Sequence, residues 1–78
     1  SDMLLGQLCA ANELSRLRLA QQMPGVGETS VRCDQGGQAF EVTLLVAPTP
    51  NPSFRRVDAH VRLGASPLLR LSTVMGRY

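Results

Sequence analysis

The sequence predicts an α+β domain, in which one N-terminal helix packs on a small antiparallel sheet of about four strands. Three observations indicate this class. Residues 2–22 are almost all good helix formers. From residue 29 the apolar residues alternate with polar ones, as in half-buried strands. Segments rich in glycine and proline separate these alternating runs. The helix is then the element available to cover the apolar face of the sheet.

The helix is expected over residues 2–22, with Gly6 as its weak point. The segment Met23-Pro24-Gly25-Val26-Gly27 ends it. Pro24 disfavours helical geometry at the residue before it, and the two glycines allow a turn.

The sheet is expected over residues 29–75. A first strand, 29–33, leads into a hairpin turn at 34–38, where Gly36 and Gly37 can adopt positive φ. Residues 39–46 and 56–63 alternate regularly between apolar and polar side chains. The segment 48–52 contains three prolines and is expected to lie outside the sheet as a stiff connection. A turn at 64–67 precedes a last strand at 68–75.

Length and composition favour a single globular domain, 1–78, with a small core of its own. Hydrophobic residues make up 44% of the chain and the net charge is +2. The basic residues, all arginine, are interspersed with acidic ones, and aromatic residues are only 4% of the chain, which argues against nucleic-acid binding. No apolar run is long enough to span a membrane. Ser1-Asp2 before Met3 favours a trimmed portion of a longer protein.

Cys9 and Cys33 are the two cysteines, and their spacing leaves two readings open. A disulfide between helix and first strand would stabilise a small domain in an oxidising compartment. Alternatively, both are free, partly buried thiols. Without a CxxC or CxxH spacing, no metal site is expected.

No catalytic residue or cofactor site is expected either. His60, the single histidine, lies between Asp58 and Arg62 at strand spacing, with no nucleophile arrangement around it. Gly36-Gly37 precedes no helix and no lysine, so it is interpreted as a turn, not a phosphate loop. Arg55-Arg56 is expected to solubilise the start of a strand, with binding of a partner carboxylate as the alternative.

The helix carries apolar residues on more than one side, which indicates a surface for partners. One arc is predicted to pack on the sheet and includes Met3, Ala10, Leu14 and Leu17; Cys9, Glu13 and Arg16 are placed on the opposite side. A second arc contains Leu4, Leu8, Ala11 and Leu19. We expect Leu4, Leu8, Ala11 and Ser15 to meet partner helices. The alternative is that a small sheet curls around the helix and covers both arcs.

Three segments occur in an order that resembles a known family. They are ANELSRLRL at 11–19, MPGVGE at 23–28, and APTPNP at 47–52 leading into RRVDAHV at 55–61. With the glycine hairpin between them, they resemble the I-type minor pseudopilin of bacterial type II secretion systems. The resemblance covers nearly the whole chain and implies a truncated pilin-like fold.

The resemblance implies a periplasmic domain anchored in the inner membrane by a methylated, hydrophobic N-terminal helix that is absent from this sequence. With the J-type and K-type minor pseudopilins it would form the tip of the pseudopilus, above the major pseudopilin, and help to export proteins across the outer membrane. This role requires no catalysis, and no calcium site is expected. Two alternatives remain open: a minor pilin of a type IV pilus, and a small non-pilin enzyme or accessory domain.

Overall fold

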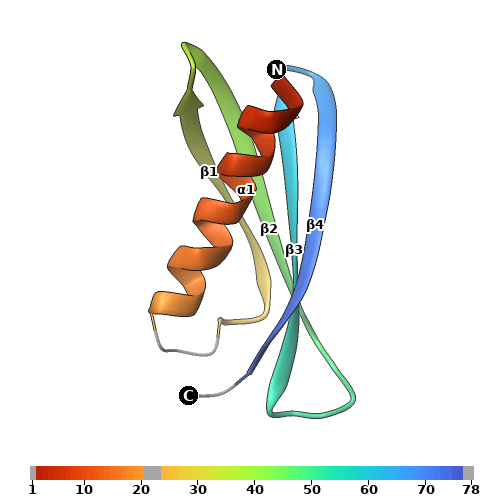
Figure 1. The fold of residues 1–78 in the computed structure, drawn as a ribbon. Helices are drawn as coiled ribbons and strands as arrows, with labels where there is room; N and C mark the ends of the chain where they lie inside the picture. The colour runs from red at the N-terminus through yellow and green to blue at the C-terminus, as the bar shows by residue number, and fades with distance from the viewer. Residues whose placement is uncertain (1, 21–23, 77–78) are drawn as a thin grey trace.

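The computed structural model describes residues 2–20 and 24–76 of the chain (Figure 1). Helix α1 (Asp2–Leu19) is followed by strands β1 (Gly27–Gln35), β2 (Gln38–Pro48), β3 (Phe54–Leu63) and β4 (Ser66–Gly76). The strands form one sheet in the order β1-β2-β3-β4, and each pairs antiparallel with the next. The predicted α+β class, one helix on a four-stranded antiparallel sheet, is therefore confirmed.

Helix α1 ends at Leu19, and the following backbone N–H of Ala20 still donates to the carbonyl of Arg16 at 3.1 Å. The predicted last helical residues, 21 and 22, and Met23 of the predicted break lie outside the described residues. Pro24 and Gly25 lie between α1 and β1, where they were expected to separate helix from sheet, whereas Gly27 is the first residue of β1.

The β1–β2 hairpin closes through Gly36 and Gly37, which lie between the paired residues Gln35 and Gln38. Their φ angles are 57° and 78°, and positive φ at both central residues is the geometry of a type I′ turn. This turn matches the right-handed twist of the two strands. The expected hairpin is thus confirmed, with both strands longer than the sequence predicts.

Two prolines lie within strands, where a turn or a connection was expected. Pro48 is the last residue of β2 and pairs with Arg55 of β3. On its other side β2 has no paired residue at this position, because the pairing with β1 ends where Gly27 meets Val46. Pro67 belongs to the edge strand β4, next to a register shift between Val61 and Arg62. Proline is tolerated at the ends of strands and in edge strands, because the backbone nitrogen there does not have to donate a hydrogen bond to a neighbouring strand. The turn before β4 is therefore shorter than expected and contains Gly64, with φ 62°.

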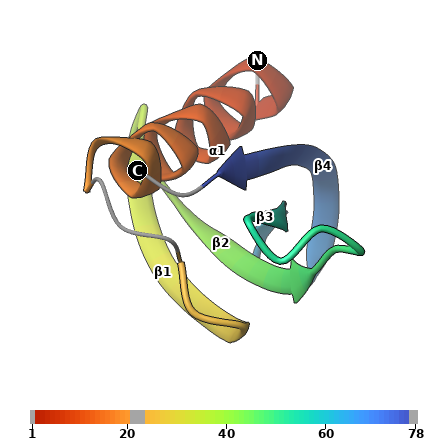
Figure 2. The same cartoon turned by 90° about the horizontal axis from the view of Figure 1, so that it is seen from below.

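The view in Figure 2 shows α1 on one face of the twisted sheet, and the buried side chains of the core come from this helix and the sheet. Gly6 lets the helix approach closely: a Cβ atom there would lie 3.3 Å from Leu69 Cδ2 and 3.4 Å from Val61 Cγ1. No described element covers the other face of the sheet. The buried apolar side chains are those of Cys9, Ala10, Leu14, Phe40, Val42, Leu44, Val57, Ala59, Val61 and Met75.

Candidate partner interface

Helix α1 has an inner face against the sheet and an exposed apolar face away from it. The residues that were expected to pack on the sheet include Ala10, which is fully buried, and Leu14, which is 9% exposed. Leu17 is partly buried and packs against the same core. The buried residues of the helix are Gly6, Cys9, Ala10, Glu13 and Leu14.

The predicted rotation of the helix was wrong in part. Met3, expected on the sheet side, is 47% exposed. Cys9 and Glu13, expected on the opposite side, are 0% and 6% exposed and belong to the inner face. The physical reason is that the small residue Gly6 and the link from Cys9 to β1 turn this side of the helix inward.

The exposed side carries Leu4, Leu8, Ala11, Ser15 and Leu19, which we call the outer face. These residues are three or four positions apart, so they share one side of a helix. The leucine side chains remain 64%, 47% and 81% exposed, so the sheet does not wrap around the helix to cover them. Leu4, Leu8 and Ala11 also line a shallow apolar hollow together with Leu5 and Gln7.

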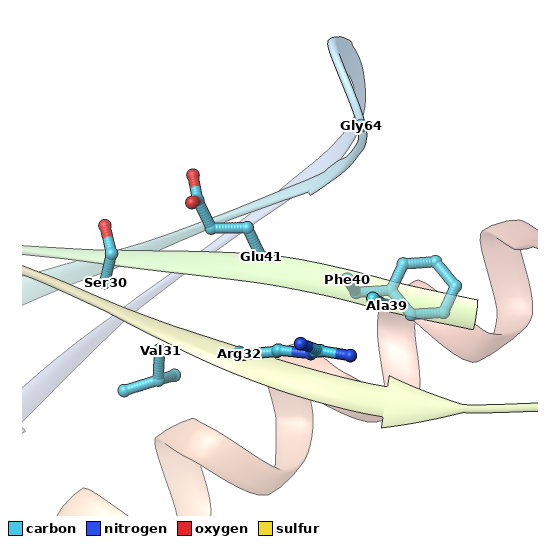
Figure 3. A pocket seen from close by; sticks show the side chains of 7 residues that line it. All are labelled: Ser30, Val31, Arg32, Ala39, Phe40, Glu41 and Gly64. Atoms are coloured by element: carbon cyan, nitrogen blue, oxygen red, sulfur yellow. The ribbon is translucent and has the colours of Figure 1, made fainter. Parts of the chain in front are cut away.

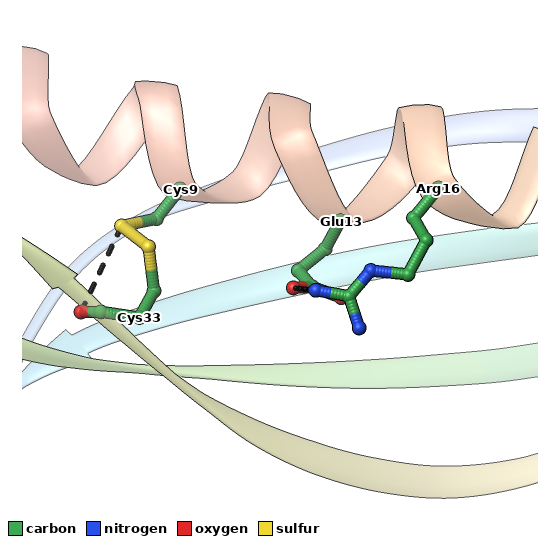
Figure 4. A network of polar contacts seen from close by, with 4 residues as sticks. All are labelled: Cys9, Glu13, Arg16 and Cys33. Atoms are coloured by element: carbon green, nitrogen blue, oxygen red, sulfur yellow. Dashed lines mark hydrogen bonds and ion pairs between the residues drawn. A yellow bond between two sulfur atoms is a disulfide. The ribbon is translucent and has the colours of Figure 1, made fainter.

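Contacts along the helix hold it in this orientation. Cys9 forms a disulfide with Cys33 of β1, with the two Cα atoms 6.0 Å apart (Figure 4). At the N-terminal end, Gln38 Nε2 donates to Asp2 Oδ1 at 2.5 Å. Near the C-terminal end, Arg18 Nη2 donates to Thr73 Oγ1 of β4 at 3.2 Å. The outer face is thus held away from the sheet at both ends of the helix.

The inner face also contains a carboxylate. Glu13 Oε1 lies 2.6 Å from Arg16 Nη2, and the Glu13 side chain is 7% exposed whereas that of Arg16 is 72% exposed (Figure 4). A charge this close to the core is tolerable because the guanidinium neutralises it and donates a hydrogen bond. Burial of Glu13 was not predicted, because the sequence shows only a glutamate near an arginine.

The face of the sheet away from α1 carries mainly polar side chains and contains a second hollow (Figure 3). Ser30, Arg32 and Glu41 line it, with Ala39 and Gly64 beside them. Arg32 Nε is paired with Asp34 Oδ1 at 2.8 Å. Within the ranges 2–20 and 24–76, no group of three or more His, Cys, Asp or Glu side chains could hold a metal ion. The hollow is open and offers no arrangement that indicates catalysis.

The two adjacent arginines of β3 have different contacts. Arg55 Nη1 donates to the carbonyl of Pro24 and so ties the segment after α1 to the start of β3. Arg56 Nη2 lies 3.2 Å from Asp58 Oδ2 on the face away from α1. His60 is two residues further along and partly exposed. Neither the Arg55 contact nor that of Arg18 was predicted, because their partners are distant in sequence.

Comparisons with known proteins identify the family. No curated protein matches the chain significantly. In the described part of the chain, no helix has both the length and the apolar character that a membrane crossing requires. A family model described as type II secretion system protein I matches residues 1–76, nearly the whole chain. The chain therefore belongs to the protein I family of the type II secretion system and is an I-type minor pseudopilin.

Proposed function

We propose that this pseudopilin assembles with J-type and K-type minor pseudopilins into the tip of the pseudopilus, through the outer face of α1. The family is a structural component of the secretion system, and membership suggests contacts with other pseudopilus components. The observation that carries the proposal is the outer face itself: three leucines of one helix are exposed opposite a side that is already buried against a sheet.

Leaving the leucines of the outer face in water is unfavourable. Each square ångström of apolar surface removed from water contributes about 25 cal/mol, so covering the leucines of the outer face favours association. The small side chains of Ala11 and Ser15 lie between Leu8 and Leu19. They leave room for the side chains of a second helix to pack between these leucines. A neighbouring helix is therefore the occupant that fits best.

In this assembly the domain would initiate or cap the pseudopilus, with the major pseudopilin extending it, during export across the outer membrane. Type II secretion pseudopilins are periplasmic and associated with the inner membrane. We propose that this one is anchored there by a hydrophobic helix continuous with α1. The coding sequence upstream of Met3 tests the anchor: it should encode a prepilin-type cleavage site followed by about 20 apolar residues.

Substitutions on the outer face test the assembly. Leu8→Arg and Ala11→Glu should each weaken binding to soluble J-type and K-type domains by about tenfold or more, because a charge must then be buried. The matched control is Val74→Arg, since Val74 is also exposed, at 55%, but lies on β4 away from the helix. Circular dichroism establishes that each variant folds. Undiminished binding by folded Leu8→Arg and Ala11→Glu proteins would refute the interface.

A further inference from the structure

We infer that the partner helix covering the outer face of α1 carries a carboxylate opposite Arg18, and that Arg18 thereby selects this partner among helices with apolar surfaces. The inference rests on the proposed function of the same face. It adds the chemistry of the partner, which the leucines alone do not specify.

Arg18 lies at the border of the outer face. At about 100° per residue, its position on the helix falls between Leu14, on the inner face, and Ala11, on the outer face. Its Nη2 atom donates to Thr73 Oγ1 of β4 at 3.2 Å, so the guanidinium is held beside the helix. A helix packed on the outer face would therefore pass close to this group.

Among residues 2–20 and 24–76, the Arg18 guanidinium is held in place by a hydrogen bond but forms no ion pair with a carboxylate. Thr73 is an uncharged acceptor, and a guanidinium has five N–H donors, so donors remain available. The ion pairs recorded within residues 2–20 and 24–76 join Arg16 to Glu13, Arg32 to Asp34 and Arg56 to Asp58; none includes Arg18. Arg16, near the other border of the outer face, already has its carboxylate.

A second copy of the chain would not supply the missing carboxylate. The acidic residues of α1 are Asp2, which at about 100° per residue lies on the side of the helix opposite Ala11, and Glu13, which is buried on the inner face. Two outer faces packed together would bring leucines and arginines together without a negative charge from either helix. The charge distribution therefore favours a different protein whose helix places an aspartate or glutamate beside its apolar residues.

Loss of water from the Arg18 guanidinium makes binding selective for a partner that carries a carboxylate. When a partner covers the outer face, the Arg18 guanidinium loses part of its contact with water, and an unpaired charge in that position opposes binding. A carboxylate on the partner removes the penalty and adds a charge-assisted hydrogen bond. Partners with equal apolar surface but no carboxylate are then disfavoured.

The test measures the affinity of the chain for soluble J-type and K-type domains at low and high salt. Arg18→Glu should raise Kd by about tenfold or more for the partner that bears the carboxylate, because like charges then meet. Arg18→Gln should flatten the dependence of Kd on salt. Thr73→Val removes the positioning hydrogen bond but keeps the charge, so it should have a smaller effect. The matched control, Arg62→Glu, changes an exposed arginine on the far face of β3 and should leave Kd unchanged.

The outcomes separate this inference from the proposed function. If Leu8→Arg abolishes binding but Arg18→Glu binds both domains as the wild type does, the interface stands and the role of Arg18 is refuted. If the salt dependence survives in Arg18→Gln, the inference also fails. Replacing one partner carboxylate by arginine should restore binding to Arg18→Glu, which would identify the paired residue. Self-association of the wild-type chain as tight as its binding to the other domains would overturn the choice of partner.

Discussion

Cys9 in the middle of α1 is covalently joined to Cys33 near the end of β1. Strand β1 is at the edge of the sheet and, within the part of the chain that the structure describes, pairs with β2 alone. The disulfide therefore fastens the helix to a strand that has a hydrogen-bonded neighbour on one side alone. Because Cys9 is fully buried, the same bond is part of the packing between helix and sheet.

Removing this disulfide should lower the free energy of unfolding by about 3 kcal/mol, because the bond closes a loop with a sequence separation of 24 and restricts the unfolded chain. Urea unfolding of the wild type, with and without reductant, measures the loss. The Cys9→Ser/Cys33→Ser protein is the control, since reductant should not change its stability. Alkylation of both cysteines in the native, unreduced protein would contradict the prediction.

The extent to which the sequence predicts this fold depends on the range of the interactions involved. The helix, the glycine hairpin and the alternating strands follow from residues close together in the chain, and the structure contains them. The four residues expected to meet a partner, Leu4, Leu8, Ala11 and Ser15, lie together on the exposed side because helical spacing alone groups them. Their function remains a prediction.

The rotation of the helix on the sheet could not be predicted from helical spacing. It depends on the close approach at Gly6, the link from Cys9 and the pairing of Glu13 with Arg16, and two of these require knowing what lies opposite in the sheet. Side-chain hydrophobicity favours Met3 over Glu13 for the inner face, yet in the structure the methionine is exposed and the glutamate is buried. Contacts between residues distant in sequence therefore determine which side of the helix faces the sheet, and the local pattern of hydrophobic residues does not.

The ion pair of Glu13 and Arg16 should contribute more to stability than a surface pair of similar length. Arg16→Met leaves the Glu13 carboxylate, 7% exposed, without its guanidinium, and we expect a loss of about 1–3 kcal/mol. Arg32→Met breaks the pair with Asp34, whose side chain is 65% exposed, and should change stability by less than about 1 kcal/mol. Urea unfolding at neutral pH compares the two. Equal losses would show that burial of Glu13 does not matter.

Enlarging Gly6 should separate the helix from the sheet. A Cβ atom added at this position would lie 3.3 Å from Leu69 Cδ2, so Gly6→Leu should lower the free energy of unfolding by about 1–3 kcal/mol through overpacking. Intrinsic helix propensity acts in the opposite direction, because leucine favours the helix over glycine. Ala11→Leu, at an exposed position of the same helix, is the control and should have little effect. A Gly6→Leu protein as stable as the wild type would show that the contact can relax.

Asp58 of β3 is a largely buried carboxylate on the face of the sheet away from α1. A hydrogen bond from the Ser72 side chain lowers the pKa of Asp58 below its usual value of 3.8. Burial acts in the opposite direction, whereas the positive charges of Arg56, Arg70 and His60 lower the pKa further. The folded state therefore favours the ionised form of the Asp58 carboxyl group over its protonated form.

Acid should remove the stability that Asp58 contributes. Because its pKa is lower in the folded protein than in the unfolded chain, the contribution is fully present above pH 3.8 and is lost as the pH falls through the lowered folded value. Asp58→Asn should therefore be less stable than the wild type at neutral pH and lose less stability between about pH 4 and pH 2. Urea midpoints across this range measure both effects, with Asp34→Asn as the exposed control. An acid sensitivity in Asp58→Asn equal to that of the wild type would show that another carboxyl group is responsible.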